Sequence, residues 1–427
     1  MGDAERPQGT EGVGGVSGAI RPVPPGPDTG VTPRPSDGDA GACMVRPGRE
    51  IPRELLEYRV PTEPPDRSAL RPYSYGPAPW VVGSIETAAE PVPLVSTSLT
   101  AADHLGAWRV RWDIRRSHYR VAPGLYGVGR PDAASPVLVT ANYKLTFDAL
   151  RRELPGLDAW VLVLETCGVN VWCAASKGTF STAELARRVV SVRLAAVVSH
   201  RRLVVPQLGA PGVAGHQVRR ACGFSVTFGP VRAADIPAFL AAGMEATPEM
   251  RRVCFPLRDR AVLIPVELSA AWRWKLLAAV VVLAFLLGIG GDRLFSPAAY
   301  GLRLAMVYGS VLASLLGGAV VVPLALPWLP GRAFAAKGAL VGGVVATAGL
   351  AAFWTTLPPL VLAVLLLAVT AATSYVAMNF TGSTTFTSLS GVEKEMRAWL
   401  PLQVGAAGLA AVLLVVQGVL RIVGVES

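Results

Sequence analysis

One short segment of the chain combines a cysteine, a tryptophan and a run of small residues. It follows the apolar run from Trp160 to Leu164 and reads Asn170-Val171-Trp172-Cys173-Ala174-Ala175-Ser176-Lys177-Gly178. The Cys173 thiolate would be a strong electron donor to a metal, and small residues allow a large flat ligand to approach the backbone closely. The alternative is a packed core thiol, because free cysteine is among the residue types most often buried.

The elements that would position this segment form an α/β pattern between about residues 136 and 268. Short β-type runs alternate with amphipathic segments, which is typical of parallel strands joined by crossover helices. We expect strands at residues 137–140, 160–164, 203–205 and 224–228. The cysteine segment then leaves the carboxyl end of a strand, where open α/β sheets bind their ligands.

Three local patterns refine this α/β prediction. Residues 147–154 have helical periodicity, and Ser181 to Glu184 reads as a capping box that opens the next helix. The alternation from Trp108 to Trp112 predicts a strand. The turn Leu208-Gly209-Ala210-Pro211-Gly212 follows the strand at 203–205; its glycines either line a ligand or serve a tight turn, and the pattern favours neither.

Composition divides the 427-residue chain into three parts. Residues 1–71 are rich in Pro and Gly and are predicted to be disordered, residues 72–268 form the α/β domain, and residues 269–427 form a membrane domain. The net charge of +10 accompanies no aromatic-basic motif, so a nucleic-acid partner is not expected. The 5 cysteines are scattered and do not suggest a disulfide framework.

The membrane domain is predicted from long apolar runs. Five transmembrane helices are expected, each near the length that a bilayer requires, at residues 272–289, 304–328, 338–356, 360–378 and 402–423. Arg273, Arg332, Lys337 and Lys394 lie beside or between these runs, and the positive-inside rule places them in the cytoplasm together with the α/β domain. The runs contain no obvious acidic or histidine relay, which favours an anchor over a transport role.

The cysteine segment resembles the cap helix of the mercury-methylating corrinoid proteins, the HgcA family. The family signature is Asn-(Val/Ile)-Trp-Cys-Ala-(Ala/Gly)-Gly-Lys, and seven of its eight positions match, with Ser176 in place of Gly. The flanks at residues 140–148, 207–213 and 229–232 are similar to the corrinoid-binding domain that this family shares with the large subunit of the corrinoid iron-sulfur protein. The expected membrane helices and the loop at residues 378–396 resemble the mercury-methylating family.

This resemblance implies a Rossmann-like domain that binds a corrinoid (cobalamin, B12-type), with Cys173 as the lower axial ligand of its cobalt. Methyl transfer to Hg(II), forming methylmercury, is the implied activity. The cap would contact the cofactor, and Ser176 adds a hydroxymethyl group to it. The residues implied in cofactor binding are Thr140, Asn170, Val171, Trp172, Cys173, Ala174, Ala175, Ser176, Lys177, Gly178, Leu208, Gly209, Ala210 and Gly212.

The chain lacks a cysteine-rich iron-sulfur motif and a barrel-sized segment for a methyl-folate donor. The resemblance therefore implies two partners, the ferredoxin HgcB with [4Fe-4S] clusters and a methyltetrahydrofolate-linked methyltransferase, beside membrane lipid. Two alternatives stay open. The first is a membrane-bound methyl carrier for another acceptor, of the acetyl-CoA-pathway type, and the second is a corrinoid-binding transporter or sensor without transfer chemistry.

Overall fold

The α/β domain is built on a seven-stranded sheet. The computed structural model describes residues 78–269, 297–351, 354–355, 357–381, 384 and 389–423. The strand order is β1-β2-β3-β5-β4-β6-β7. The strands are β1 (Val81–Ile85), β2 (Val92–Val95), β3 (Gly124–Val128), β4 (Val137–Ala141), β5 (Ala159–Leu164), β6 (Arg202–Val205) and β7 (Ser225–Phe228).

The four strands predicted from the sequence are adjacent and parallel. β4 pairs in parallel with β5 on one side and β6 on the other, and β6 continues to β7. The remaining strands make the sheet mixed, because β3 runs antiparallel to β5 and β1 runs antiparallel to β2. The α/β class is therefore confirmed, with an antiparallel extension that the sequence pattern did not reveal.

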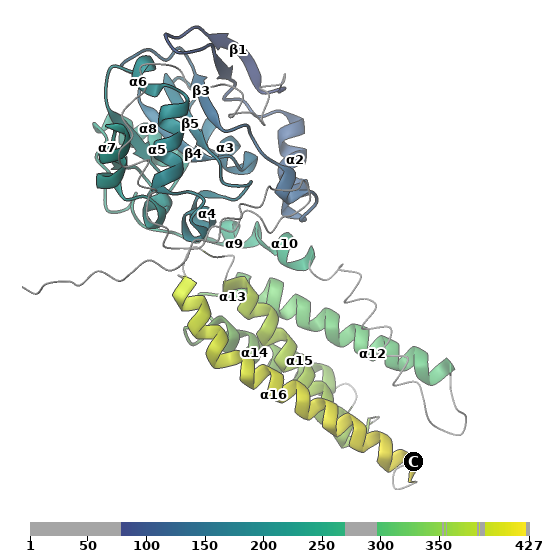
Figure 1. Cartoon of the computed structure of the whole chain (residues 1–427). Coiled ribbons are helices and arrows are strands. Elements are labelled where there is room, and N and C mark those ends of the chain that lie inside the picture. Colours follow the sequence, from purple (N-terminus) through teal and green to yellow (C-terminus); the bar gives the residue numbers. More distant parts are fainter. Residues whose placement is uncertain are drawn as a thin grey trace, which may run out of the picture. The chain divides into compact units, whose positions relative to one another are not determined.

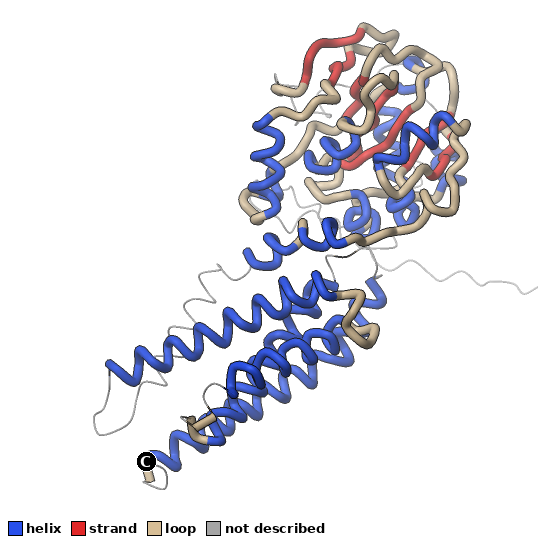
Figure 2. Tube along the Cα trace, turned by 180° about the vertical axis from the view of Figure 1, so that it is seen from behind, coloured by secondary structure: helices blue, strands red, loops and turns tan. Residues whose placement is uncertain are grey.

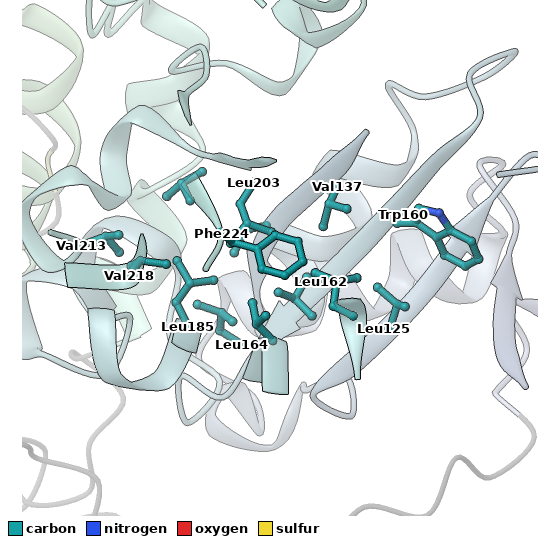
Figure 3. Packing of buried hydrophobic residues seen from close by; sticks show 14 of the residues in the cluster. Leu125, Val137, Trp160, Leu162, Leu164, Leu185, Leu203, Val213, Val218 and Phe224 are labelled. Atoms are coloured by element: carbon teal, nitrogen blue, oxygen red, sulfur yellow. The ribbon is translucent and has the colours of Figure 1, made fainter. Parts of the chain in front are cut away.

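Helices cover both faces of this sheet (Figures 1 and 2). One apolar cluster joins Val137, Leu162 and Leu203 of the strands to α4, α5, α6 and α7 (Figure 3). The other joins Leu138 and Val161 to α3 and α8. Alternate strand residues thus point to opposite faces. The helices are α2 (Ala101–Arg111), α3 (Lys144–Arg151), α4 (Val171–Lys177), α5 (Thr182–Ser191), α6 (Leu194–Val197), α7 (Gly215–Cys222), α8 (Ile236–Ala241), α9 (Leu257–Ala261) and α10 (Ile264–Ser269).

The predicted strand at Trp108–Trp112 was wrong, because these residues continue and end helix α2. Thr100 caps the helix in a complete capping box with Asp103, and this local signal outweighs a short alternation of apolar and charged residues. Trp108 is exposed and its ring lies 6.4 Å from that of Trp112. The turn after α2 contains Asp113 and Arg115 with positive φ.

The predicted cap of α5 is present in part. The Ser181 side chain accepts a hydrogen bond from the backbone N–H of Glu184, as expected. The Glu184 carboxylate has other partners: it accepts the backbone N–H of Glu165 at 2.9 Å and pairs with Arg188 at 2.7 Å. Glu184 thereby ties α5 to the end of β5.

A buried cluster of four charged side chains fixes α2 against α3. Lys144 Nζ lies 2.7 Å from both Asp103 and Asp148, and Arg151 lies 2.8 Å from Asp103 and 2.7 Å from Asp148. Arg151 also donates to the carbonyl oxygens of Ser96 and Ser98. Each charge has an opposite charge beside it, as buried ions require. We call these four residues the paired cluster.

The C-terminal part consists of long apolar helices. They are α12 (Pro297–Leu316), continued by a π-helical turn (Gly317–Val321) and α13 (Val322–Ala325), and then α14 (Phe334–Ala351), α15 (Pro359–Phe380) and α16 (Leu389–Ile422). Among the described residues, four helices have the length and composition to cross a membrane. The first predicted span, at residues 272–289, lies outside the described residues. Lys337, expected between two spans, instead lies within α14, where Nζ donates to the Leu326 carbonyl oxygen at 2.7 Å.

Small residues allow α14 and α15 to cross closely. A Cβ atom at Gly338 would lie 2.5 Å from the Ala377 side chain, and one at Gly342 would lie 2.7 Å from Thr373. Ser374 donates to the Ala335 carbonyl oxygen at 2.9 Å and accepts from Gln403 of α16 at 2.9 Å. Close packing at small residues and hydrogen bonds between helices are the usual means by which membrane helices associate.

Candidate functional site

A buried asparagine shapes the turn that leads into the cysteine segment. Asn142 follows β4, and its Oδ1 accepts hydrogen bonds from the Thr166 N–H, the Thr166 hydroxyl and the Gly168 N–H at 2.8–3.1 Å. Its Nδ2 donates to Glu165 at 2.8 Å. The turn contains two consecutive residues of positive φ, Cys167 (58°) and Gly168 (70°). Asn142 thus holds in place a turn that the backbone alone would rarely adopt.

The cysteine segment folds as the short helix α4, with a cap at each end. Asn170 is the N-cap, and its Oδ1 accepts the backbone N–H of Cys173 at 2.9 Å. Gly178 is the C-cap with φ of 79°, and its N–H donates to the carbonyl oxygens of Ala174 and Ala175. Both residues were predicted as cofactor contacts, and the structure gives each a role in delimiting the helix. An N-cap of this type contributes about 1 kcal/mol.

The two faces of α4 differ in burial. Val171, Ala174 and Ala175 point into the apolar core, so the small size of the alanines serves packing within the protein. Trp172, Cys173 and Ser176 are half-buried, and Lys177 is exposed. These four residues make up the outer face, which is the part of the predicted segment with surface available to a ligand.

The predicted glycine turn supports α4 from behind. Residues Gln207–Gly212 form a 3-10 helix, in which a Cβ atom at Gly212 would lie 2.1 Å from the Phe180 carbonyl oxygen and 3.1 Å from the Ala175 Cα. A Cβ at Gly209 would lie 2.6 Å from the Phe180 ring. Close contacts with Phe180 and with Ala175 of α4 explain these glycines. Of the other predicted residues, Leu208 packs on the core, Ala210 is half-buried, and Thr140 is buried in β4.

Cys173 carries a free thiol on this outer face. Burial raises the pKa of the thiol, while Lys177, the hydrogen bond with Asn170 and Arg116 lower it, and the net shift is upward. Cys222 and Cys254 also have free thiols, whereas Cys167 is disulfide-bonded, which its spacing did not predict. A sulfur donor in the first turn of a short, capped helix is a ligand type that soft metal centres accept, so the donor fits the cobalt of a corrinoid.

The segment after α2, which sequence reasoning did not assign to the site, lies across the ends of β4 and β5. The backbone N–H of Val121 donates to the Asn142 carbonyl oxygen at 2.9 Å, and the backbone N–H of Lys144 donates to the Tyr119 carbonyl oxygen at 3.0 Å. A Cβ atom at Gly168 would lie 2.9 Å from the Arg120 side chain. This segment therefore packs on the turn before α4, and its run of arginines is the signal that could have pointed to it.

Tyr143 connects this segment to the cysteine. Its ring is buried, and the Arg116 guanidinium lies over it, 5.9 Å from the ring centroid. Burial raises the pKa of Tyr143, Arg116 and Arg111 lower it, and Asp113 and Cys173 raise it. Tyr143, Cys173 and these arginines therefore share one electrostatic environment.

Comparison with known proteins gives a match to this domain. Residues 112–240 match the model of the CO dehydrogenase/acetyl-CoA synthase delta subunit family. The acetyl-CoA decarbonylase/synthase complex subunit gamma of Methanopyrus kandleri is 34% identical over 127 residues, which cover 29% of this chain and 27% of the relative. The corresponding subunit of Archaeoglobus fulgidus is 29% identical over 127 residues, with the same shares covered.

A third relative matches over a similar length. The corrinoid/iron-sulfur protein large subunit of Moorella thermoacetica is 30% identical over 127 residues, covering 29% of this chain and 28% of the relative. The chain thus spans about a quarter of the length of these relatives. Residues 112–240 form a domain of the CO dehydrogenase/acetyl-CoA synthase delta subunit type, related to the large subunit of the corrinoid/iron-sulfur protein.

Proposed function

We propose that this protein is a membrane-anchored corrinoid protein in which Cys173 ligates cobalt from the lower face of the cofactor. The observation that carries the proposal is the free thiol on the outer face of α4, a capped helix that follows a parallel strand in a domain related to corrinoid proteins. The other outer-face residues, Trp172, Ser176 and Lys177, contact the cofactor. When bound, the corrinoid supplies transfer of a methyl group at its cobalt.

The residues of the chain hold and tune this donor. Asn170 fixes the start of α4 and the backbone of Cys173, and Gly209 and Gly212 let the 3-10 helix support α4 from behind. Cys173 loses its proton on binding the metal, because a ligating cysteine is a thiolate. The thiolate of Cys173 would donate electron density to a bound cobalt, and the identity of the metal ligand is the main electronic lever of a protein on such a cofactor.

The proposed acceptor of the methyl group is Hg(II), with methylmercury as product. The cap residues from Asn170 to Lys177 support this choice through their resemblance to the mercury-methylating corrinoid proteins. A strongly donating thiolate favours release of the methyl group with its bonding electrons, the form that an electrophilic, thiophilic Hg(II) ion accepts. The reductant is then the ferredoxin HgcB, and the methyl donor is a methyltetrahydrofolate-linked methyltransferase.

A second function is a methyl carrier for another acceptor. The matched relatives of Methanopyrus kandleri and Archaeoglobus fulgidus support it, because they are subunits of acetyl-CoA decarbonylase/synthase complexes. In both cases the four apolar helices anchor the protein in the cytoplasmic membrane, and the α/β domain lies in the cytoplasm.

Methylmercury production in cells separates the two functions. Cells with this protein and its ferredoxin partner receive Hg(II), and wild type is compared with Cys173→Ala and with Cys254→Ala, which removes an exposed free thiol. We expect methylmercury from wild type and Cys254→Ala and none from Cys173→Ala. Equal amounts from wild type and Cys173→Ala would contradict the role of Cys173. No product from any variant, with a corrinoid bound, would favour the second function.

The absorption spectrum of the purified full chain tests the ligand role separately. A corrinoid bound to wild type should show a spectrum that changes when Cys173 is replaced by Ala and is unchanged in Cys254→Ala. A bound corrinoid whose spectrum is the same in all three proteins would refute ligation by Cys173.

A further inference from the structure

Three cationic side chains near Cys173 and Tyr143 have no ion-pair partner among the residues that the structure describes. Arg111, Arg116 and Lys177 form no ion pair with any other residue in the described part of the chain. The Nε of Arg111 is buried and has no hydrogen-bond partner there. We call these three residues the unpaired cluster. A buried donor without a partner is uncommon in folded proteins and calls for a specific explanation.

The unpaired cluster is gathered at one place on the domain. Lys177 lies four residues after Cys173 in α4 and therefore on the same side of the helix. Arg116 lies over the ring of Tyr143. Arg111, the last residue of α2, is close enough to lower the pKa of Tyr143. Among the groups that shift the pKa of Tyr143, Arg116 and Arg111 are cationic and the exposed Asp113 is acidic. The local balance is positive.

We propose that the unpaired cluster binds the phosphodiester of the corrinoid's nucleotide tail. The inference rests on the proposed corrinoid function. A corrinoid ring is bordered by neutral amides, and its one fixed negative group in the tail is this phosphodiester. A cysteine at the lower face displaces the tail from cobalt, so the phosphate needs another place near the lower ligand. Arginine is well suited to a phosphate, since its guanidinium offers paired N–H donors.

Three corrinoids that differ only in the tail test this inference. Cobalamin carries the phosphate and the nucleotide base, cobinamide phosphate carries the phosphate alone, and cobinamide carries neither. Dissociation constants are measured by absorption titration with the full chain in detergent. We expect cobalamin and cobinamide phosphate to bind about tenfold more tightly than cobinamide, since hydrogen bonds to a charged group contribute on this scale.

Substitutions test whether the unpaired cluster causes the preference for corrinoids that carry the phosphate. The double substitution Arg116→Gln and Lys177→Gln should remove the preference, so that all three corrinoids bind like cobinamide. Arg109→Gln replaces an exposed arginine on α2 outside the cluster and should keep it. The wild-type comparison needs no variant, so a misfolded double variant does not prevent a decision.

Each other outcome has a defined meaning. Equal binding of the three corrinoids to wild type overturns the inference and leaves the proposed function intact. Tight binding of cobalamin with weak binding of cobinamide phosphate also overturns it, because the base is then the recognised group. If no corrinoid binds, the proposed function fails and the inference fails with it.

Discussion

The paired cluster and the unpaired cluster both include a residue of helix α2 but differ in how their charges are balanced. Helix α2 contributes Asp103 near its start to the first and Arg111 at its end to the second. In the paired cluster, each charge lies within 2.8 Å of an opposite charge, and all four residues are buried. In the unpaired cluster, the cations are exposed or half-buried near Cys173 and Tyr143.

This difference separates side chains that hold the domain together from side chains left available to a ligand. A buried charge without its partner is strongly destabilising, so the paired cluster is needed for folding. The unpaired cations retain contact with water, with the exception of the Arg111 Nε, and their removal leaves no buried charge behind. Substitutions in the two clusters should therefore affect different properties, stability in one and ligand chemistry in the other.

The largest effect is expected from Arg151→Met. This change leaves Lys144 as the one cation beside Asp103 and Asp148 among the described residues, and it removes the donors to the Ser96 and Ser98 carbonyl oxygens. Breaking a buried ion pair in this way costs about 3–5 kcal/mol. Denaturant unfolding of the full chain in detergent, followed by the near-ultraviolet signal of the α/β domain, would measure it.

Arg152→Met is the matched control. Its side chain is 53% exposed and pairs with Glu153 at the surface, so the change in unfolding free energy should stay within about 0.5 kcal/mol. Equal losses from Arg151→Met and Arg152→Met would show that the paired cluster does not stabilise the fold.

Acid should remove the contribution that the Asp103 carboxylate of the paired cluster makes to stability. Burial raises the pKa of Asp103, but hydrogen bonds from Lys144 and Thr100 outweigh it and hold the pKa well below its usual value of 3.8. A lowered pKa means that this contribution to stability is present above about pH 4 and is lost as the pH falls below it. The denaturant concentration at the unfolding midpoint should therefore be lower at pH 3 than at pH 5.

Asp103→Asn tests the source of that drop. This variant should be less stable than wild type at pH 7 and should lose less additional stability in acid, because its side chain does not titrate. An equally steep acid decline in wild type and in Asp103→Asn would assign the pH dependence to other carboxylates.

The sequence predicted secondary structure best where apolar periodicity or helix-capping residues were present. The parallel strands β4 to β7 and the N-cap at Ser181 were predicted because buried strands read as short apolar runs and helix starts have their own residue types. Helix α2 was missed because Trp108 to Trp112 alternates like a strand, although Thr100 and Asp103 carry the capping signal.

The environment of the site depended on contacts that are distant in sequence. Asn142 shapes the turn at Thr166 to Gly168 from the neighbouring strand, and no spacing rule connects residues that far apart. The roles of Gly209 and Gly212 required the position of Phe180. Cys173 itself could be selected from its segment. The arginines near it could not, because the sequence contains many arginines and does not show which of them lack an acidic partner.

The smallest effect concerns the reactivity of the Cys173 thiol in the corrinoid-free chain. Lys177 and Arg116 lower its pKa, and Lys177 has the larger influence. Lys177→Gln should therefore raise the pKa, reduce the thiolate fraction at pH 8 and slow alkylation by about twofold to fourfold. Arg116→Gln should slow it less, and neither variant should lower stability as Arg151→Met does.

Mass spectrometry of alkylated peptides gives the rates, with the exposed thiol of Cys254 as an internal reference. Because Lys177 is exposed, its influence should shrink in about 1 M KCl, where charges are screened within about 3 Å. A rate difference at Cys254 as large as that at Cys173 would point to a general change in the protein. Unchanged alkylation of Cys173 in both variants, at low salt, would separate the unpaired cluster from the thiol and leave only its proposed role toward the phosphate.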